Sequence, residues 1–117
     1  MSDVNISTES LKRVNLVTAA GRIDSETAPE LDKALKESYQ HGRHNIVIEL
    51  SGVSYMSSAG LRALVAANRE CKKKGGDVRL AAPSDRVAEV LSLAGLVAGQ
   101  DSFFQLFDDS TSAVGSF

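Results

Sequence analysis

Two adjacent serines, Ser57 and Ser58, are the side chains in this sequence best placed to do chemistry. They stand between the apolar, β-branched segment 45–50, which predicts a buried strand, and residues with the three- and four-residue spacing of a helix. Unpaired backbone N–H groups and the positive end of the helix dipole meet at such a helix start and stabilise a phosphate placed there. Serine is also a preferred N-cap residue, so the local pattern fits either a helix cap or an anion site.

A carboxylate, Asp24, directly follows a second predicted strand. If that strand lies beside segment 45–50 and parallel to it, Asp24 stands next to the serines, because sites in open α/β sheets form beyond the carboxyl ends of parallel strands. Taken alone, an aspartate at this position more often caps or turns the chain. The sequence leaves both roles open for Asp24.

The residues needed for catalysis by known templates are missing. The sequence has no phosphate-binding loop of the Walker type, no dinucleotide fingerprint and no G-x-S-x-G elbow. His41 and His44 precede strand 45–50, so a strand of roughly 20 Å separates them from Ser58, and neither is placed to act as its base. The lone Cys71 and two histidines do not make a metal-binding set. The sequence therefore offers no catalytic or metal-binding set, and we expect a protein that is not an enzyme and has no cofactor.

Composition sets the wider limits. The chain has 117 residues, of which 43% are hydrophobic and 24% charged, as expected for one globular domain. A net charge of −2 is too small to predict binding to nucleic acid or to a membrane surface. With one cysteine, no signal-peptide pattern and no long apolar run, we expect a cytoplasmic protein, and a monomer.

Strand and helix patterns alternate along the chain, which predicts an α/β domain. We expect a mixed sheet of four to five strands with about four helices packed mainly on one face. The predicted strands are 4–6, 14–20, 45–50 and 77–81, and the predicted helices or helical turns are 28–39, 58–74, 84–94 and 103–107. The domain is expected to cover residues 1–109. Small and polar residues from Ser110 onward predict a flexible C-terminal tail over 110–117.

One polar residue, Asn68, interrupts the apolar stripe of the helix that the serines begin. The pattern fits either exposure to solvent or a hydrogen bond to a loop, and the sequence does not decide between them. Cys71 lies on the same stripe and is expected to be a core residue.

Residues 55–61, Tyr-Met-Ser-Ser-Ala-Gly-Leu, resemble the signature of bacterial anti-sigma factor antagonists, which are single-domain members of the STAS superfamily. Residues 21–24, Gly-Arg-Ile-Asp, match the end of the second strand of that family. The glycine pair 75–76 and the Leu-Ala-Gly-Leu ending of the helix at 93–96 also fall at matching positions. The resemblance runs from about residue 4 to residue 107.

The resemblance implies a STAS-like fold and a partner switch. The unphosphorylated form would bind an anti-sigma factor that is also a histidine-kinase-like serine kinase, and would thereby free a sigma factor. Phosphorylation on Ser58 would abolish binding, and a serine phosphatase would reverse it. Ser57 stands where the family commonly has Asp, so Ser57 is the alternative phosphoacceptor. The residues expected to contact the partner are Asp24, Ser57, Ser58, Ala59, Gly60 and Arg62.

Two other functions compete with the switch. STAS-like domains also serve as non-switching subunits of transport or stress-signalling complexes, in which the serines would be a cap and Asp24 a docking residue. An enzymatic alternative, a small nucleotide-binding hydrolase, is opposed by the missing phosphate loop and the missing base. ATP or GTP turnover that is lost in Ser58→Ala would support it.

Overall fold

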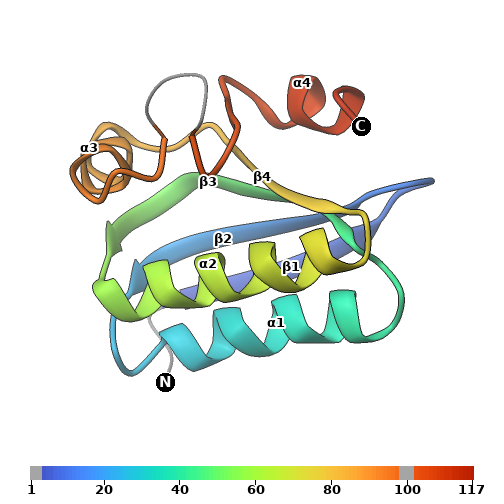
Figure 1. Ribbon diagram of the computed structural model, residues 1–117. Coiled ribbons are helices and arrows are strands. Elements are labelled where there is room, and N and C mark those ends of the chain that lie inside the picture. Colours follow the sequence, from blue (N-terminus) through green and yellow to red (C-terminus); the bar gives the residue numbers. More distant parts are fainter. Residues whose placement is uncertain (1–3, 98–101) are drawn as a thin grey trace.

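A mixed sheet forms the centre of the molecule. The structure is a computed structural model and describes residues 4–97 and 102–117. In this part of the chain five strands pair in the order β1-β2-β3-β4-β5 (Figure 1). The strands are β1 Val4–Ser10, β2 Asn15–Ile23, β3 Asn45–Met56, β4 Asp77–Ala81 and β5 Leu106–Phe107. The helices are α1 Ala28–Gln40, α2 Ser58–Lys73, α3 Asp85–Leu93 and α4 Ser110–Gly115. The predicted α/β class is confirmed.

The strand directions bring the predicted site together. β1 is antiparallel to β2, whereas β2, β3, β4 and β5 are parallel to one another. In the register of β2 with β3, Ile23 is the partner of Met56. Both strands therefore end at the same edge of the sheet, and the condition that places Asp24 beside the serines is met.

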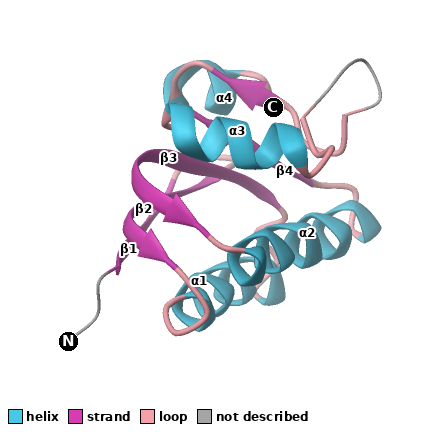
Figure 2. Cartoon of the chain, turned by 90° about the vertical axis from the view of Figure 1, so that its left-hand side faces the viewer, coloured by secondary structure: helices cyan, strands magenta, loops and turns pink. Residues whose placement is uncertain are grey.

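The helices cover both faces of the sheet, so the expectation that they pack mainly on one face is wrong. Figures 1 and 2 show α1 and α2 against one face and α3 and α4 against the other. The reason lies in β3, where the consecutive residues Ile46, Val47 and Ile48 are all fully buried. Side chains alternate between the faces of a strand, so an unbroken apolar run needs cover on both sides.

β3 is twice as long as the sequence pattern predicts. It continues to Met56 through Ser51 and Gly52, although a Ser-Gly pair is typical of a turn. The strand passes very close to β2 here, since a Cβ added at Gly52 would lie 2.9 Å from the Cβ of Ala20. The pairing of β2 with β3 is irregular at the same place, between Thr18 and Ala20. The glycine therefore permits a close strand contact and does not end the strand.

The C-terminal segment also differs from the prediction. Residues 103–107 contain the short strand β5, not a helical turn, although Phe104 is buried as expected of a core residue. The segment 110–117, expected to be a flexible tail, forms α4 and contacts the sheet.

A helix cap, a buried side chain and an arginine–aromatic contact are among the interactions that hold this segment. The Asp109 carboxylate caps α4 by accepting a hydrogen bond from the Ser112 amide at 2.7 Å. Ala113 is fully buried. The Arg79 guanidinium lies 3.9 Å from the ring centre of Phe117. Ala113, Val114 and Phe117 are the apolar residues of this segment, and they stand among small and polar ones, too weak a pattern to predict a docked helix.

Asn68 is fully buried and joins three segments of the chain. Its side-chain oxygen accepts a hydrogen bond from the Val78 amide at 2.9 Å, and its nitrogen donates to the Phe103 carbonyl at 3.1 Å. The choice left open by the sequence is thus settled in favour of a hydrogen-bonded residue. Cys71 is also buried, and burial raises the pKa of its thiol to about 11, as fits a core position.

No helix in the described part of the chain has the length and apolar content required to cross a bilayer. The same residues contain no group of three or more His, Cys, Asp or Glu side chains arranged to hold a metal ion.

Candidate functional site

The site lies where β2 and β3 end and α2 begins. The Ser57 amide donates a hydrogen bond to the Ile23 carbonyl at 2.8 Å, which ties the start of α2 to the end of β2. Asp24 follows Ile23 directly, so the carboxylate and the serine pair occupy neighbouring positions at one edge of the sheet. This is the arrangement that the sequence predicts for Asp24, Ser57 and Ser58.

The two serines have different roles. Ser57 is the N-cap of α2, and its hydroxyl oxygen accepts a hydrogen bond from the Gly60 amide at 3.3 Å. Ser58 is the first residue of the helix and is exposed. Within the described part of the chain, the Ser58 hydroxyl makes no hydrogen bond. The cap and the open hydroxyl are therefore both present, on different residues.

Asp24 also has a structural role. One carboxylate oxygen, Oδ1, accepts hydrogen bonds from the amides of Glu26 and Thr27 at 2.9 and 3.0 Å. These bonds, the Thr27 amide first, lower the pKa of Asp24 below its usual value, so the group is a carboxylate at neutral pH. The second oxygen, Oδ2, makes no hydrogen bond to the residues that the structure describes. Asp24 turns the chain with one oxygen and leaves the other open to a partner.

Thr27 supports this turn. Its hydroxyl donates to the Arg22 carbonyl at 2.7 Å and accepts from the Asp24 amide at 2.9 Å. Thr27 is buried. The turn that presents Asp24 is thus fixed from both ends of the segment 22–27.

Gly60 is buried under the first turn of α2 and does not lie on the surface with the other predicted site residues. A Cβ at this position would clash with Sδ of Met56 and lie 2.7 Å from Cγ2 of Ile23. The absence of a side chain lets the helix start close to the ends of β2 and β3. Any contribution of Gly60 to partner binding is therefore made through the position of Ser57 and Ser58.

We expect Gly60→Ala to lower the free energy of unfolding by about 1–3 kcal/mol, because the added methyl overpacks a closed contact. Urea unfolding followed by circular dichroism measures this change. Gly115→Ala is the matched control, since a Cβ there meets no atom within 4 Å and alanine favours a helix. Equal unfolding midpoints for the two variants would contradict the packing role of Gly60.

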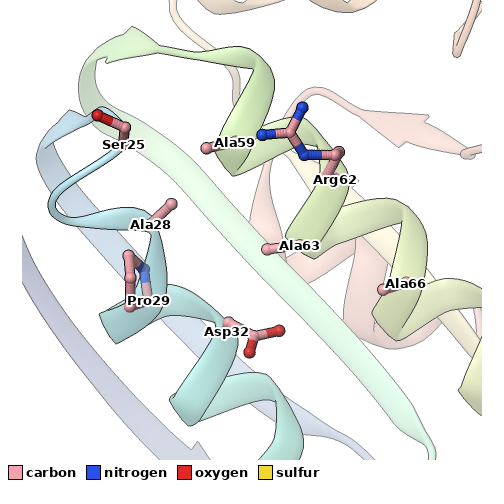
Figure 3. Close-up of a pocket in the computed structure, with 8 residues that line it drawn as sticks. All are labelled: Ser25, Ala28, Pro29, Asp32, Ala59, Arg62, Ala63 and Ala66. Carbon is pink, nitrogen blue, oxygen red and sulfur yellow. The ribbon is translucent and has the colours of Figure 1, made fainter.

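Ala59 and Arg62 extend the site along α2. Both line a groove between α1 and α2, together with residues that are mostly small (Figure 3). The α1 side of the groove carries Asp32, whose carboxylate is paired with the Lys36 ammonium at 2.9 Å. Arg62 is exposed. Among the described residues it has no hydrogen-bonding or ion-pair partner, so its charge is available to another molecule.

Two features near the site are not predicted by the sequence. The Arg22 guanidinium lies 4.5 Å from the ring centre of Tyr55, and these residues are register partners at the ends of β2 and β3. Leu96, which follows α3, lines a second groove with Ser58 and Arg62. Arg22 and Tyr55 both belong to the motifs quoted from the sequence, but the motifs do not indicate that the two side chains contact each other. Leu96 is distant in sequence and could not be placed without the fold.

Comparisons with known proteins agree with this geometry. A family model described as the STAS domain matches residues 5–113. The chain is 30% identical over 94 residues to the anti-sigma-B factor antagonist of Staphylococcus aureus strain NCTC 8325, covering 80% of this chain and 87% of that protein.

Solved structures share the fold over nearly the whole length. An anti-sigma factor antagonist from Mycobacterium paratuberculosis is 27% identical, with a TM-score of 0.85 and coverage of 97% of this chain and 92% of the other. The Bacillus cell fate determinant SpoIIAA in its phosphorylated form has a TM-score of 0.74 at 18% identity and covers 96% of this chain and 98% of the other. At that identity the likeness to SpoIIAA shows the fold alone.

Proposed function

This chain belongs to the STAS domain family, and we propose that it is an anti-sigma factor antagonist that works by partner switching. In its unphosphorylated form it binds an anti-sigma factor that is also a serine kinase, and the sigma factor is released. Phosphorylation on Ser58 ends the binding, and a serine phosphatase restores it. The chain acts in the cytoplasm as a regulatory binding protein, and the catalytic groups belong to the kinase and the phosphatase.

The observation that carries the proposal is the state of the Ser58 hydroxyl. It is exposed at the first position of α2, and no hydrogen bond to the described residues holds it. The neighbouring hydroxyl of Ser57 is engaged in the helix cap. A kinase that phosphorylated Ser57 would have to break this cap, at a cost of about 1 kcal/mol. Ser58 is therefore the better phosphoacceptor.

The reaction at Ser58 is a phosphoryl transfer from ATP. The bond between the γ-phosphorus and the β,γ-bridging oxygen breaks, and a bond forms between the phosphorus and the Ser58 oxygen. The hydroxyl proton passes to a base of the kinase, and ADP leaves. The N-terminus of α2 favours the product, because the dipole and free amides of the first helical turn stabilise negative charge. The first turn of α2 contains no acidic residue that would oppose it.

The phosphate adds negative charge to the binding surface. It adds about −1.5 to −2 charges at neutral pH beside the Asp24 carboxylate. In the free domain, water and the helix dipole stabilise this charge. In a complex the same charge is desolvated against the partner, and unfavourable charge pairs at an interface cost several kcal/mol. That is enough to release the kinase.

A non-switching subunit of a larger complex is the competing function. A non-switching subunit would need only the helix cap at Ser57, and its function would not require an exposed hydroxyl at Ser58. The distinction is made by the test below, since a subunit would not displace a sigma factor.

We expect the purified unphosphorylated chain to release the sigma factor from a preformed complex with its anti-sigma factor kinase, when the chain is added in equimolar amount. Size-exclusion chromatography separates the products. Chain that has been incubated with kinase and ATP, and is fully phosphorylated, should release less than a tenth as much. Sigma factor that stays bound in both cases would contradict the function.

A further inference from the structure

A groove on the side of α2 away from α1 begins at Ser58 and runs along the helix. Its other wall is the segment that follows α3. The α2 residues in it recur at intervals of three and four, so they form one face of the helix. The groove is lined by Ser58, Leu61, Arg62, Val65, Ala66, Arg69, Ala94 and Leu96.

The floor of the groove is apolar and only partly covered. Leu61 and Val65 from α2 and Leu96 from the other wall pack against the main core, yet each keeps part of its surface open. These three aliphatic side chains are positioned to bury further surface against a partner. The core of a protein interface is typically built from such residues.

Two arginines stand along the groove. Arg62 and Arg69 are both exposed and are seven residues apart, which is about two helical turns and roughly 10.5 Å along the axis. Within the described chain neither guanidinium has a salt bridge or a hydrogen bond, whereas Lys36 and Lys73 on the exposed sides of α1 and α2 are paired with carboxylates. No carboxylate is among the described residues that line the groove.

We infer that this groove is the docking surface for an amphipathic helix of the partner. The helix has two acidic side chains about two turns apart, which pair with Arg62 and Arg69, and aliphatic side chains between them that cover Leu61, Val65 and Leu96. Charge complementarity and continuity with Ser58 identify this occupant. The inference rests on the proposed function, because the partner is the anti-sigma factor kinase.

Because Ser58 lies in the groove, its phosphorylation also affects docking through Arg62. Ser58 and Arg62 are four residues apart on α2, a spacing at which oppositely charged side chains attract one another. A phosphate on Ser58 pairs readily with a guanidinium through charge-assisted hydrogen bonds. The phosphate therefore competes with the partner's carboxylate for Arg62. Phosphorylation removes a docking cation from the surface as well as adding negative charge to it.

The test is a set of charge reversals measured by calorimetric titration into the purified kinase with bound ADP. We expect Arg62→Glu and Arg69→Glu each to weaken binding at least tenfold, because the new carboxylate faces an acidic partner. Arg13→Glu, which makes the same change in an exposed residue before β2 at the other end of the sheet, should change the affinity less than twofold. Thermal melts establish that all three variants are folded.

Arg69→Glu is the decisive variant, because Arg69 lies eleven residues beyond Ser58 and takes no part in the phosphoacceptor site. If the wild type binds the kinase, and both groove variants bind within twofold of Arg13→Glu, the docking surface is wrong while the proposed function stands. If the wild type itself does not bind the kinase, the proposed function and the docking surface both fail.

Discussion

Ser58→Ala is expected to remain bound to the anti-sigma factor kinase in the presence of ATP, while the wild-type chain is released. The alanine lacks the only hydroxyl at the start of α2 that is exposed and free of hydrogen bonds to the described residues. The kinase can then bind the variant but cannot modify it. A pull-down on immobilised kinase, with ATP added for increasing times, should show at least tenfold more Ser58→Ala than wild type at the end point.

Ser58→Asp should show the opposite behaviour and bind at least tenfold more weakly without ATP. Its carboxylate supplies part of the charge of a phosphate beside Asp24 and Arg62. Ser57→Ala is the matched control, because it removes the cap and costs about 1 kcal/mol of stability but leaves the Ser58 hydroxyl in place. It should still be phosphorylated on Ser58 and released from the kinase when ATP is added, as the wild type is. Equal binding by Ser58→Ala and Ser58→Asp would contradict the switch.

Asn68→Ala is expected to lower the free energy of unfolding by about 2–4 kcal/mol, since it leaves a buried amide and a partly buried carbonyl without these hydrogen bonds. The Val78 amide loses its acceptor and the Phe103 carbonyl loses its donor. The loss also loosens the contacts among α2, β4 and the segment before β5. Chemical denaturation monitored by far-ultraviolet circular dichroism measures the difference.

The control for this substitution is Asn5→Ala on the exposed side of the edge strand β1. Substitutions at such surface positions usually change stability by no more than about 0.5 kcal/mol. If Asn68→Ala unfolded at the same denaturant concentration as Asn5→Ala, the buried hydrogen bonds of Asn68 would not be a major source of stability.

Local patterns predicted most of the elements of this fold. The start of α2 at Ser57 and Ser58 and its end before Gly75 follow from capping preferences, and the structure has both. The unbroken apolar run Ile46-Val47-Ile48 indicates that β3 is buried on both sides, and helices packed mainly on one face do not provide that cover. The continuation of β3 through Gly52 depends on a contact with Ala20, which only the paired sheet reveals. The position of α4 depends on its packing against β3 and β4.

The site was predicted in outline and not in detail. Motif spacing and the expected parallel sheet placed Asp24 beside Ser57 and Ser58. The sequence does not assign different roles to the two serines, because serine suits both positions at a helix start. The structure distinguishes them, since the Ser57 hydroxyl caps the helix and the Ser58 hydroxyl does not. The groove along α2 was not predicted, since Leu96 reaches it only when α3 has packed on the sheet.

The most direct test of the central claim is the mass of the intact protein after incubation with ATP and its anti-sigma factor kinase, followed by peptide mapping. The account predicts one added phosphate, located on Ser58, present in Ser57→Ala and absent in Ser58→Ala. A chain that binds the kinase yet gains no phosphate would contradict the switch and favour a non-switching subunit. A phosphate mapped to Ser57 would contradict the assignment of Ser57 as the helix cap and Ser58 as the phosphoacceptor.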